Sequence, residues 1–162
     1  MQAVKANRTI NQPQANHFLF FSIILVIFAV VGIYAFNAIR AYQASLLPQG
    51  TVVITQKSLE DKYGLRVGLV AVTAAGGMVD LRLKILDGEK AKSLLQNKKN
   101  FPSLFIGGQS LNVSDDTKTQ TIDFTNQANF YLLFPNDRGL VKSGTSVTII
   151  FGDTAVEPIP AK

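Results

Sequence analysis

The feature that most constrains this chain is an uninterrupted apolar run near its start. Residues 18–38 read FLFFSIILVIFAVVGIYAFNA and contain no charged side chain, and only Ser22 and Asn37 are distinctly polar. As a helix, these 21 residues cover about 30 Å, which is the thickness of the hydrocarbon core of a bilayer. A core helix of a soluble domain keeps a polar face, and this run has none. The run therefore predicts a transmembrane helix.

We expect this helix to be an uncleaved anchor. The run is longer than the roughly 7–15 residues of a signal-peptide core, and no A-x-A tripeptide follows it. Lys5 and Arg8 precede the run and Arg40 follows it, so the positive-inside rule leans weakly toward a cytoplasmic N-terminus. The expected organisation is a short cytoplasmic tail (1–17), the anchor (18–40), a helix extension and linker (41–50), and a periplasmic domain (51–162) at the cell membrane.

The residues expected to contact the bilayer lie along the apolar run and its C-terminal flank. Aromatic rings and snorkelling cations are favoured in the interfacial zone of a membrane. The membrane-anchor candidates are Phe18, Phe21, Ile24, Ile27, Val31, Tyr34, Arg40 and Tyr42. Small residues recur every three positions, but they wrap around the helix and form no GxxxG motif, so the simpler interpretation is ordinary lipid-facing positions.

After Pro48-Gln49-Gly50 the pattern changes to that of a mainly-β domain. Runs rich in β-branched residues and bounded by turn residues predict strands at 51–56, 65–73, 78–86, 103–106, 119–124, 129–134, 146–151 and 155–159. The second and third runs flank a glycine-containing turn and predict a hairpin. Asp87 as N-cap and Glu89 in a first turn predict one helix over 87–99. The expected fold is an antiparallel β-sandwich with immunoglobulin-like proportions and one short helix; a β-barrel is the alternative.

Composition restricts the chemistry available to this chain. There is no Cys, and the one His, His17, lies in the N-terminal tail. Disulfides, thiolate metal sites, a Cys nucleophile and a multi-His metal site are therefore excluded, and the domain has no imidazole for a Ser-His-Asp triad. The glycine pairs at 76–77 and 107–108 match neither the Walker pattern nor the dinucleotide fingerprint. We expect no enzymatic activity, no cofactor and no metal.

The charged residues have simple structural interpretations. The net charge is +5, of which the first 47 residues carry +3, so the domain is close to neutral and no nucleic-acid binding is expected. Asp115-Asp116 is interpreted as part of a turn, with a calcium site as the alternative. The lysines of the predicted helix are interpreted as a solvated face, with anionic lipid or an acidic partner as the alternative: Lys90, Lys92, Lys98 and Lys99.

Several predicted strands carry apolar residues on both faces. In residues 129–134 (NFYLLF), Tyr131 and Leu133 fall on the face that an antiparallel sandwich normally leaves to solvent. Coverage by a helix, a loop or the membrane surface is one interpretation, and a docking patch for a partner protein is the other. The candidate partner contacts are Phe101, Phe105, Tyr131, Leu133 and Ile150.

Together these features favour a non-catalytic single-pass membrane protein. Its extracytoplasmic β-sandwich is expected to dock on a larger membrane complex as an accessory or stabilising subunit. The expected partners are the lipid bilayer and other subunits of that complex. The alternative is a tethered binding module for a small ligand, lipid or envelope polymer, which needs a concave apolar pocket between the sheets.

Overall fold

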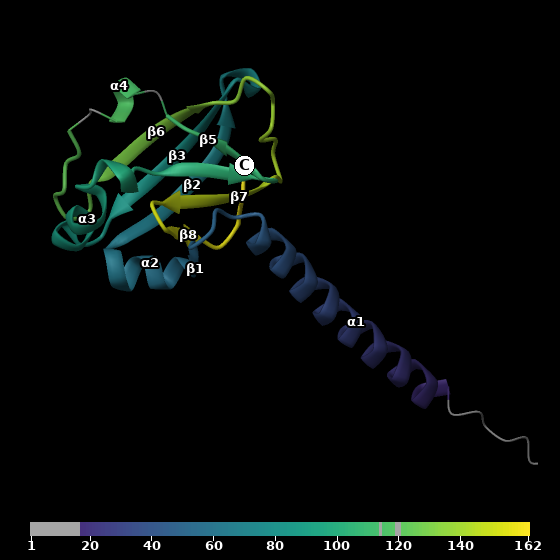
Figure 1. The fold of residues 1–162 in the computed structure, drawn as a ribbon. Coiled ribbons are helices and arrows are strands. Elements are labelled where there is room, and N and C mark those ends of the chain that lie inside the picture. Colours follow the sequence, from purple (N-terminus) through teal and green to yellow (C-terminus); the bar gives the residue numbers. More distant parts are fainter. Residues whose placement is uncertain (1–16, 114, 119–120) are drawn as a thin grey trace, which may run out of the picture. The chain divides into compact units, whose positions relative to one another are not determined.

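The chain divides into two compact units, Met1–Tyr42 and Gln43–Lys162, which are described separately. The structure, a computed structural model, describes residues 17–113, 115–118 and 121–162 (Figure 1). It shows an apolar N-terminal helix followed by a mainly-β domain with two sheets.

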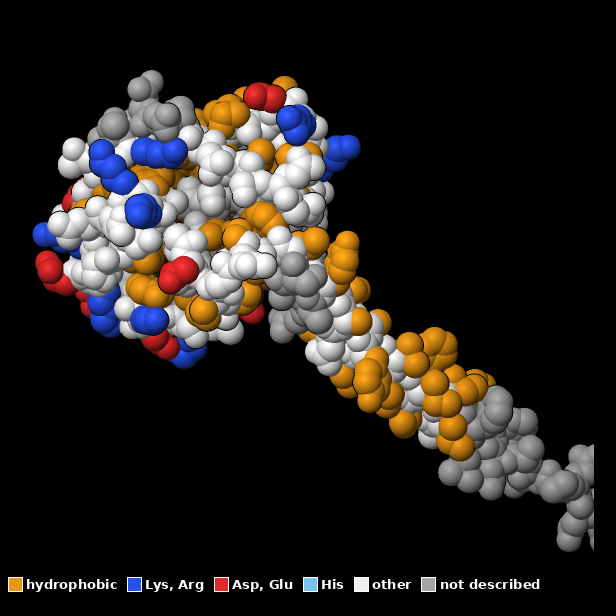
Figure 2. Space-filling view, viewed as in Figure 1, with side chains coloured by type: hydrophobic (Ala, Val, Ile, Leu, Met, Phe, Trp, Pro, Cys, Tyr) orange, Lys and Arg blue, Asp and Glu red, His pale blue; other side chains and the backbone are white. Residues whose placement is uncertain are grey.

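The first unit contains helix α1, His17–Ser45, whose last residues extend into the second unit. The segment Phe21–Ile39 is long and apolar enough to cross a membrane, and none of it is buried in the structure. Figure 2 shows hydrophobic side chains along the visible surface of this helix. A long apolar helix near an N-terminus is also what a signal sequence provides. The predicted helix is thus confirmed as an element, and its membrane role remains a prediction.

The second unit is built from short strands joined by turns and short helices. Its strands are β1 (Val52–Ile54), β2 (Leu65–Thr73), β3 (Met78–Ile85), β4 (Ser103–Ile106), β5 (Gln109–Leu111), β6 (Asn129–Pro135), β7 (Ser146–Phe151), β8 (Thr154–Val156) and β9 (Ile159–Pro160). Its helices are α2 (Gln56–Tyr63), α3 (Gly88–Leu95), α4 (Asp115–Lys118) and the 3₁₀ turns η1 (Ala74–Gly76) and η2 (Lys98–Asn100).

The strands form two sheets. One has the order β1-β8-β7-β4-β5, with β9 also paired to β7, and the other has the order β2-β3-β6 (Figure 1). The predicted hairpin is confirmed as β2 and β3, which pair antiparallel around η1. A single apolar core contains residues of both sheets, among them Leu81, Leu83 and Leu132 from one and Leu104, Ile149 and Phe151 from the other.

Backbone hydrogen bonds join the two sheets through the last residues of the chain. The N–H of Lys162 donates to the carbonyl of Val70, and the N–H of Val72 donates to the carbonyl of Lys162, at 2.9 and 2.8 Å. The residues just before Lys162 form β9, which pairs with β7 of the other sheet. Lys162 therefore occupies the outer edge of β2 at Val70 and Val72.

Several predicted elements need correction. The predicted strand over 51–56 is the shorter β1, and a helix that was not predicted, α2, follows it, because Thr55 caps the N-terminus of this helix and Gly64 ends it at φ 60°. Residues 121–124 form no strand, and residues 119–120 lie outside the described part of the chain. The predicted helix over 87–99 ends at Leu95, although Asp87 caps it as expected.

The sheets also depart from the prediction of a purely antiparallel fold. Strand β1 runs parallel to β8, the short strand β5 was not predicted, and the predicted strand over 155–159 divides into β8 and β9. Beyond the single predicted helix, the described residues include α2 and α4.

A second, smaller apolar cluster lies apart from the main core. Phe105, Ile150 and Ala155 are buried, and Leu46 and Leu47 pack against them. Only residues 40–45 separate the apolar segment of α1 from this contact. The two leucines thus fix the beginning of the second unit onto β4, β7 and β8.

Asn136 fixes the turn that follows β6. Its side chain is buried and donates to the carbonyls of Gly76 and Val141 at 2.8 and 2.9 Å, and it accepts from the N–H of Val141 at 3.1 Å. These bonds connect the β2–β3 turn with residues 136–141. The same turn holds Ala74 and Ala75 at φ 50° and 52°, a conformation that non-glycine residues rarely adopt.

Replacing this amide tests its contribution to stability. Asn136→Ala leaves two buried backbone groups of Val141 and one partly buried carbonyl of Gly76 without this partner, and we expect it to lower the free energy of unfolding by about 2–3 kcal/mol. Urea denaturation of the full chain, followed by circular dichroism, measures the change. Asn112→Ala, at an exposed asparagine, is the control and should change stability by less than about 0.5 kcal/mol. Equal stability of the two variants contradicts the structural role of Asn136.

Candidate functional site

The outer face of the β2-β3-β6 sheet carries exposed apolar side chains on β6. Along this strand Phe130, Leu132 and Phe134 are buried, whereas Tyr131 and Leu133 are 54% and 50% exposed. The guanidinium of Arg82, on the neighbouring strand β3, lies 5.7 Å from the centre of the Tyr131 ring. Arg82 also pairs with Asp80 at 2.8 Å. Tyr131 and Leu133 therefore form an apolar strip beside a row of charges.

The same two residues lie on an open strand edge. The N–H of Asn136 donates to Gly77, and Ala128 accepts from Ile85, so the even-numbered residues of β6 direct their backbone groups toward β3. The odd-numbered residues Tyr131 and Leu133 direct theirs to the other side. Within the described part of the chain, no strand pairs with β6 on that side. We call the outward backbone groups and side chains of Tyr131 and Leu133 the β6 edge.

The other candidate partner contacts lie elsewhere. Phe105 and Ile150 come together, but they are buried under Leu46 and Leu47 and leave no open surface. Phe101 packs edge-on against Phe130, with ring centres 6.0 Å apart, and belongs to the border of the main core. The five candidates are thus distributed over three places, and Tyr131 and Leu133 are the two that are largely exposed.

The membrane-anchor candidates all lie within α1. Large hydrophobic side chains exposed on this helix include Phe21, Ile27, Val31, Tyr34 and Tyr42, and Ile24 is partly exposed. The side chains of Phe18 and Arg40 lie outside the described residues. An exposed apolar surface on every side of a helix fits a lipid environment better than water.

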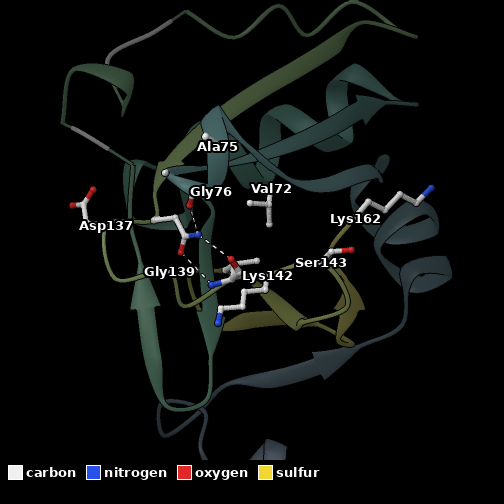
Figure 3. Close-up of a pocket in the computed structure, with 11 residues that line it drawn as sticks. Val72, Ala75, Gly76, Asp137, Gly139, Lys142, Ser143 and Lys162 are labelled. Atoms are coloured by element: carbon white, nitrogen blue, oxygen red, sulfur yellow. Dashed lines mark hydrogen bonds between the residues drawn. The ribbon is translucent and has the colours of Figure 1, made fainter.

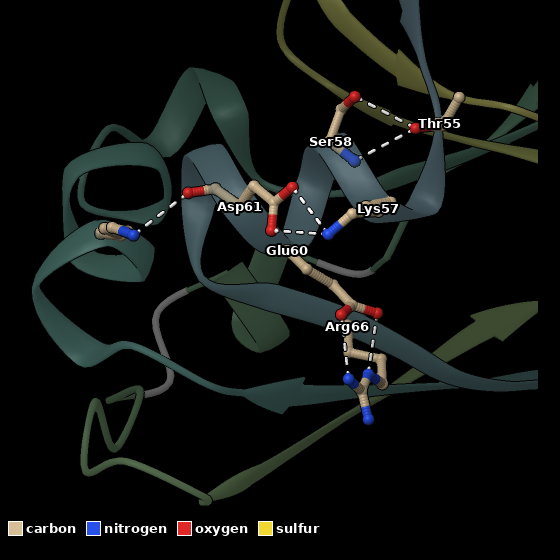
Figure 4. A network of polar contacts seen from close by, with 7 residues as sticks. Thr55, Lys57, Ser58, Glu60, Asp61 and Arg66 are labelled. Atoms are coloured by element: carbon tan, nitrogen blue, oxygen red, sulfur yellow. Dashed lines mark hydrogen bonds and ion pairs between the residues drawn. The ribbon is translucent and has the colours of Figure 1, made fainter.

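A polar network lies on α2 and the start of β2 (Figure 4). Arg66 donates from Nε and Nη2 to the two carboxylate oxygens of Glu60 at 2.8 and 2.9 Å. This bidentate contact lowers the pKa of Glu60 below its ordinary value. Lys57 pairs with Asp61 on the same helix at 3.1 Å. Both pairs lie at the surface, and the Glu60–Arg66 pair links α2 to β2.

Among the described residues, no group of three or more His, Asp or Glu side chains is placed to hold a metal ion. The side chains of Asp115 and Asp116 lie outside the described part, so the calcium alternative for that turn stays a prediction. Lys90 pairs with Asp87 at 3.6 Å and also donates to the carbonyl of Asp61 at 3.1 Å, which connects α3 to α2.

An open pocket of about 640 Å³ lies beside the Asn136 turn (Figure 3). Its lining includes Val72, Gly76, Val141 and Lys142. The side chains of Asp137 and Lys162 point away from its middle (Figure 3). The ligand alternative needs an apolar pocket between the sheets, and this pocket is a different one, because its described lining contains no aromatic side chain.

The sequence predicted the outward side chains of the β6 edge but not its unpaired backbone groups. Alternation identified Tyr131 and Leu133 as outward side chains, but strand order cannot be read from alternation, so the unpaired backbone was missed. One signal was present: Pro135 ends the strand, and proline is tolerated in sheets chiefly at edges because it lacks an N–H donor.

The Glu60–Arg66 pair makes a prediction about the pH dependence of stability. The folded-state pKa of Glu60 is lowered, so its favourable contribution is complete above the unfolded-state pKa and is lost as pH falls through the folded-state pKa. Glu60→Gln should therefore be slightly less stable than the original chain at pH 7, and this difference should vanish at acidic pH. Urea denaturation at several pH values measures it.

Glu89→Gln is the matched control for this experiment. Glu89 is exposed in the first turn of α3 and forms no ion pair with the described residues. Its substitution should leave the difference between neutral and acidic pH almost unchanged. A Glu60→Gln variant with the same pH dependence as the original chain contradicts a stabilising role for the pair.

No protein-family model, no curated protein and no solved structure matches this chain. Its function has to be inferred from the described surfaces themselves.

Proposed function

We propose that this chain is a non-catalytic, single-pass membrane protein whose domain docks on a larger membrane complex as an accessory or stabilising subunit. In this proposal α1 is an uncleaved anchor, the N-terminus is cytoplasmic, and a β-sandwich with immunoglobulin-like proportions lies in the periplasm. The docking surface is the β6 edge.

The observation that carries this proposal is the combination of two features on β6. Tyr131 and Leu133 expose about half of their side-chain surface, and their backbone groups are unpaired in the described part of the chain. Exposed strand edges are normally protected by charged residues, by proline or by a covering segment. Pro135 protects one end of this edge, but the outward side chains between Asn129 and Pro135, those of Tyr131 and Leu133, are uncharged. An edge left open in this way is suited to bind another polypeptide.

The anchor supports the same role. Residues 40–45 are the whole connection between the apolar segment and Leu46, which packs on the domain. A fully extended connection of this length reaches only about 20 Å. A domain held on so short a tether meets membrane-bound partners far more often than soluble ones.

A tethered binding module for a small ligand is the second candidate. The pocket of about 640 Å³ beside Asn136 has the volume of a small-molecule site. Its lining includes three glycines, and the charged side chains of Asp137 and Lys162 point away from its middle (Figure 3), so the β6 edge favours the docking proposal.

The anchor is tested by the mass and the extraction behaviour of the mature protein. The intact mass should include residues 1–45, and the protein should stay in the membrane pellet after alkaline carbonate treatment. A mature form that begins after the apolar run and appears in the soluble fraction identifies α1 as a cleaved signal sequence and contradicts the anchor.

Docking is tested by co-purification from gently solubilised membranes. The double variant Tyr131→Ser/Leu133→Ser removes the apolar strip of the β6 edge, and we expect at least a tenfold loss of the proteins recovered with the original chain. Val52→Ser/Val53→Ser is the matched control, because these side chains are 61% and 45% exposed on β1, in the other sheet. Equal losses in both variants, or no loss in either, contradict the proposed surface.

A further inference from the structure

Two exposed apolar side chains lie near the start of the domain, away from the β6 edge. Val52 and Val53, on β1, are 61% and 45% exposed. Within the described part of the chain β1 pairs only with β8, at the end of the larger sheet. The N–H of Val52 and the carbonyl of Ile54 bond toward β8, so the backbone groups of Val53 point to the open side. We call Val52 and Val53 the β1 valines.

The β1 valines adjoin the residues with which the domain begins. Val53 is the ladder partner of Ala155, and Ala155 is the ladder partner of Ile150, so these three side chains lie on one face of the sheet. Ala155 and Ile150 belong to the small apolar cluster against which Leu46 and Leu47 pack. The two leucines are only partly buried there. Val53 therefore continues an apolar surface that begins at Leu46.

The length of the chain holds this surface close to the bilayer when α1 spans the membrane. Residues 40–45 belong to α1 and add only about 9 Å beyond the apolar segment that ends at Ile39. The headgroup layer on each side of the hydrocarbon core is itself about 5–8 Å thick. Leu46 therefore lies within a few ångströms of the headgroups, and the apolar surface that it begins lies beside them.

We propose that the β1 valines, together with Leu46 and Leu47, form a surface that contacts the membrane at its headgroup layer. This inference rests on the proposed anchor, and it assigns lipid, not protein, as the partner of β1. Apolar side chains at a membrane surface enter the boundary between headgroups and acyl chains, where they leave water. The open backbone groups of Val53 stay in the hydrated headgroup layer, where water satisfies them.

The charges around the β1 valines are of both signs. Lys57 and Lys62 lie on α2, whereas Asp153 and Glu157 flank β8. A contact driven by charge needs a cluster of basic residues and selects anionic lipids. The apolar contact proposed here should instead form on uncharged phosphatidylcholine and should change little when the salt concentration is raised.

The anchor explains how so small a surface is sufficient. A few aliphatic side chains bind a membrane only weakly on their own, because membrane affinity increases with the apolar area that is buried. A domain on a short tether has a high effective concentration at the membrane, and this makes a weak second contact persist. We therefore expect the contact in the full-length chain.

Tryptophan fluorescence tests the contact, because the original chain has no Trp. Full-length Val53→Trp is reconstituted in phosphatidylcholine vesicles with or without bromine atoms on the acyl chains near the headgroups. Bromine quenches an indole only on contact, so we expect a loss of roughly half of the fluorescence. Leu133→Trp is the matched control, because Leu133 is 50% exposed in the other sheet, and its fluorescence should stay almost unchanged. Circular dichroism checks the fold of both variants.

Cysteine alkylation provides a second measurement, because tryptophan has its own preference for the membrane interface. The original chain also has no Cys, so Val53→Cys and Leu133→Cys each carry one thiol. Both are treated with a water-soluble maleimide in the same vesicles, and each rate is divided by the rate of that variant in denaturant. Val53→Cys should react several times more slowly than Leu133→Cys.

The outcomes separate this contact from the proposed function. Equal quenching of both tryptophan variants, or no quenching of Val53→Trp, overturns the membrane contact, and so does equal alkylation of the two thiols. Fewer co-purifying proteins with Val52→Ser/Val53→Ser overturn it too, because protein then covers the β1 valines. If Val53→Trp is not quenched while the chain resists carbonate extraction, the anchor stands and the contact is wrong. If it is quenched while Tyr131→Ser/Leu133→Ser loses no partners, the contact stands and docking at the β6 edge is wrong.

Discussion

The backbone hydrogen bonds between Lys162 and β2 determine which edge of the three-stranded sheet is open. They attach Lys162 to the outer edge of β2 at Val70 and Val72, and β9, just before it, pairs with β7. The three-stranded sheet is thereby joined to the larger sheet on one side. Its other side ends at β6, so the open edge, the exposed apolar strip and the candidate site all fall on one strand.

Local patterns predicted much of this arrangement. The charge-free run marked α1, regular alternation marked β3, a run of apolar and aromatic residues marked β6, and Asp87 marked the start of α3, because each signal depends on residues close together in the sequence. Helix α2 was missed although its cap residues were present. Its sequence is mostly polar and shows no helical periodicity of apolar residues. The ends of this helix are set instead by Thr55 and Gly64, and buried Leu59 attaches it to the core.

Contacts between distant residues account for the remaining differences. Ile150 was expected to face outward because its neighbours Ile149 and Phe151 face the core, but Leu46 and Leu47 cover it from about a hundred positions earlier in the chain. The parallel pairing of β1 with β8 has the same character, since it joins residues 52–54 to residues 154–156. Such pairings depend on the folding of the whole chain, and the periodicity of apolar residues in a short segment does not indicate them.

The join at Lys162 also has a consequence for the order in which the domain can fold. Lys162 bonds to Val70 and Val72, about ninety positions earlier in the chain, and β9 pairs with β7 beside it. Bringing such distant residues together costs loop-closure entropy before their hydrogen bonds form. The attachment of the three-stranded sheet to the larger sheet at this point is therefore a late, non-local step of folding.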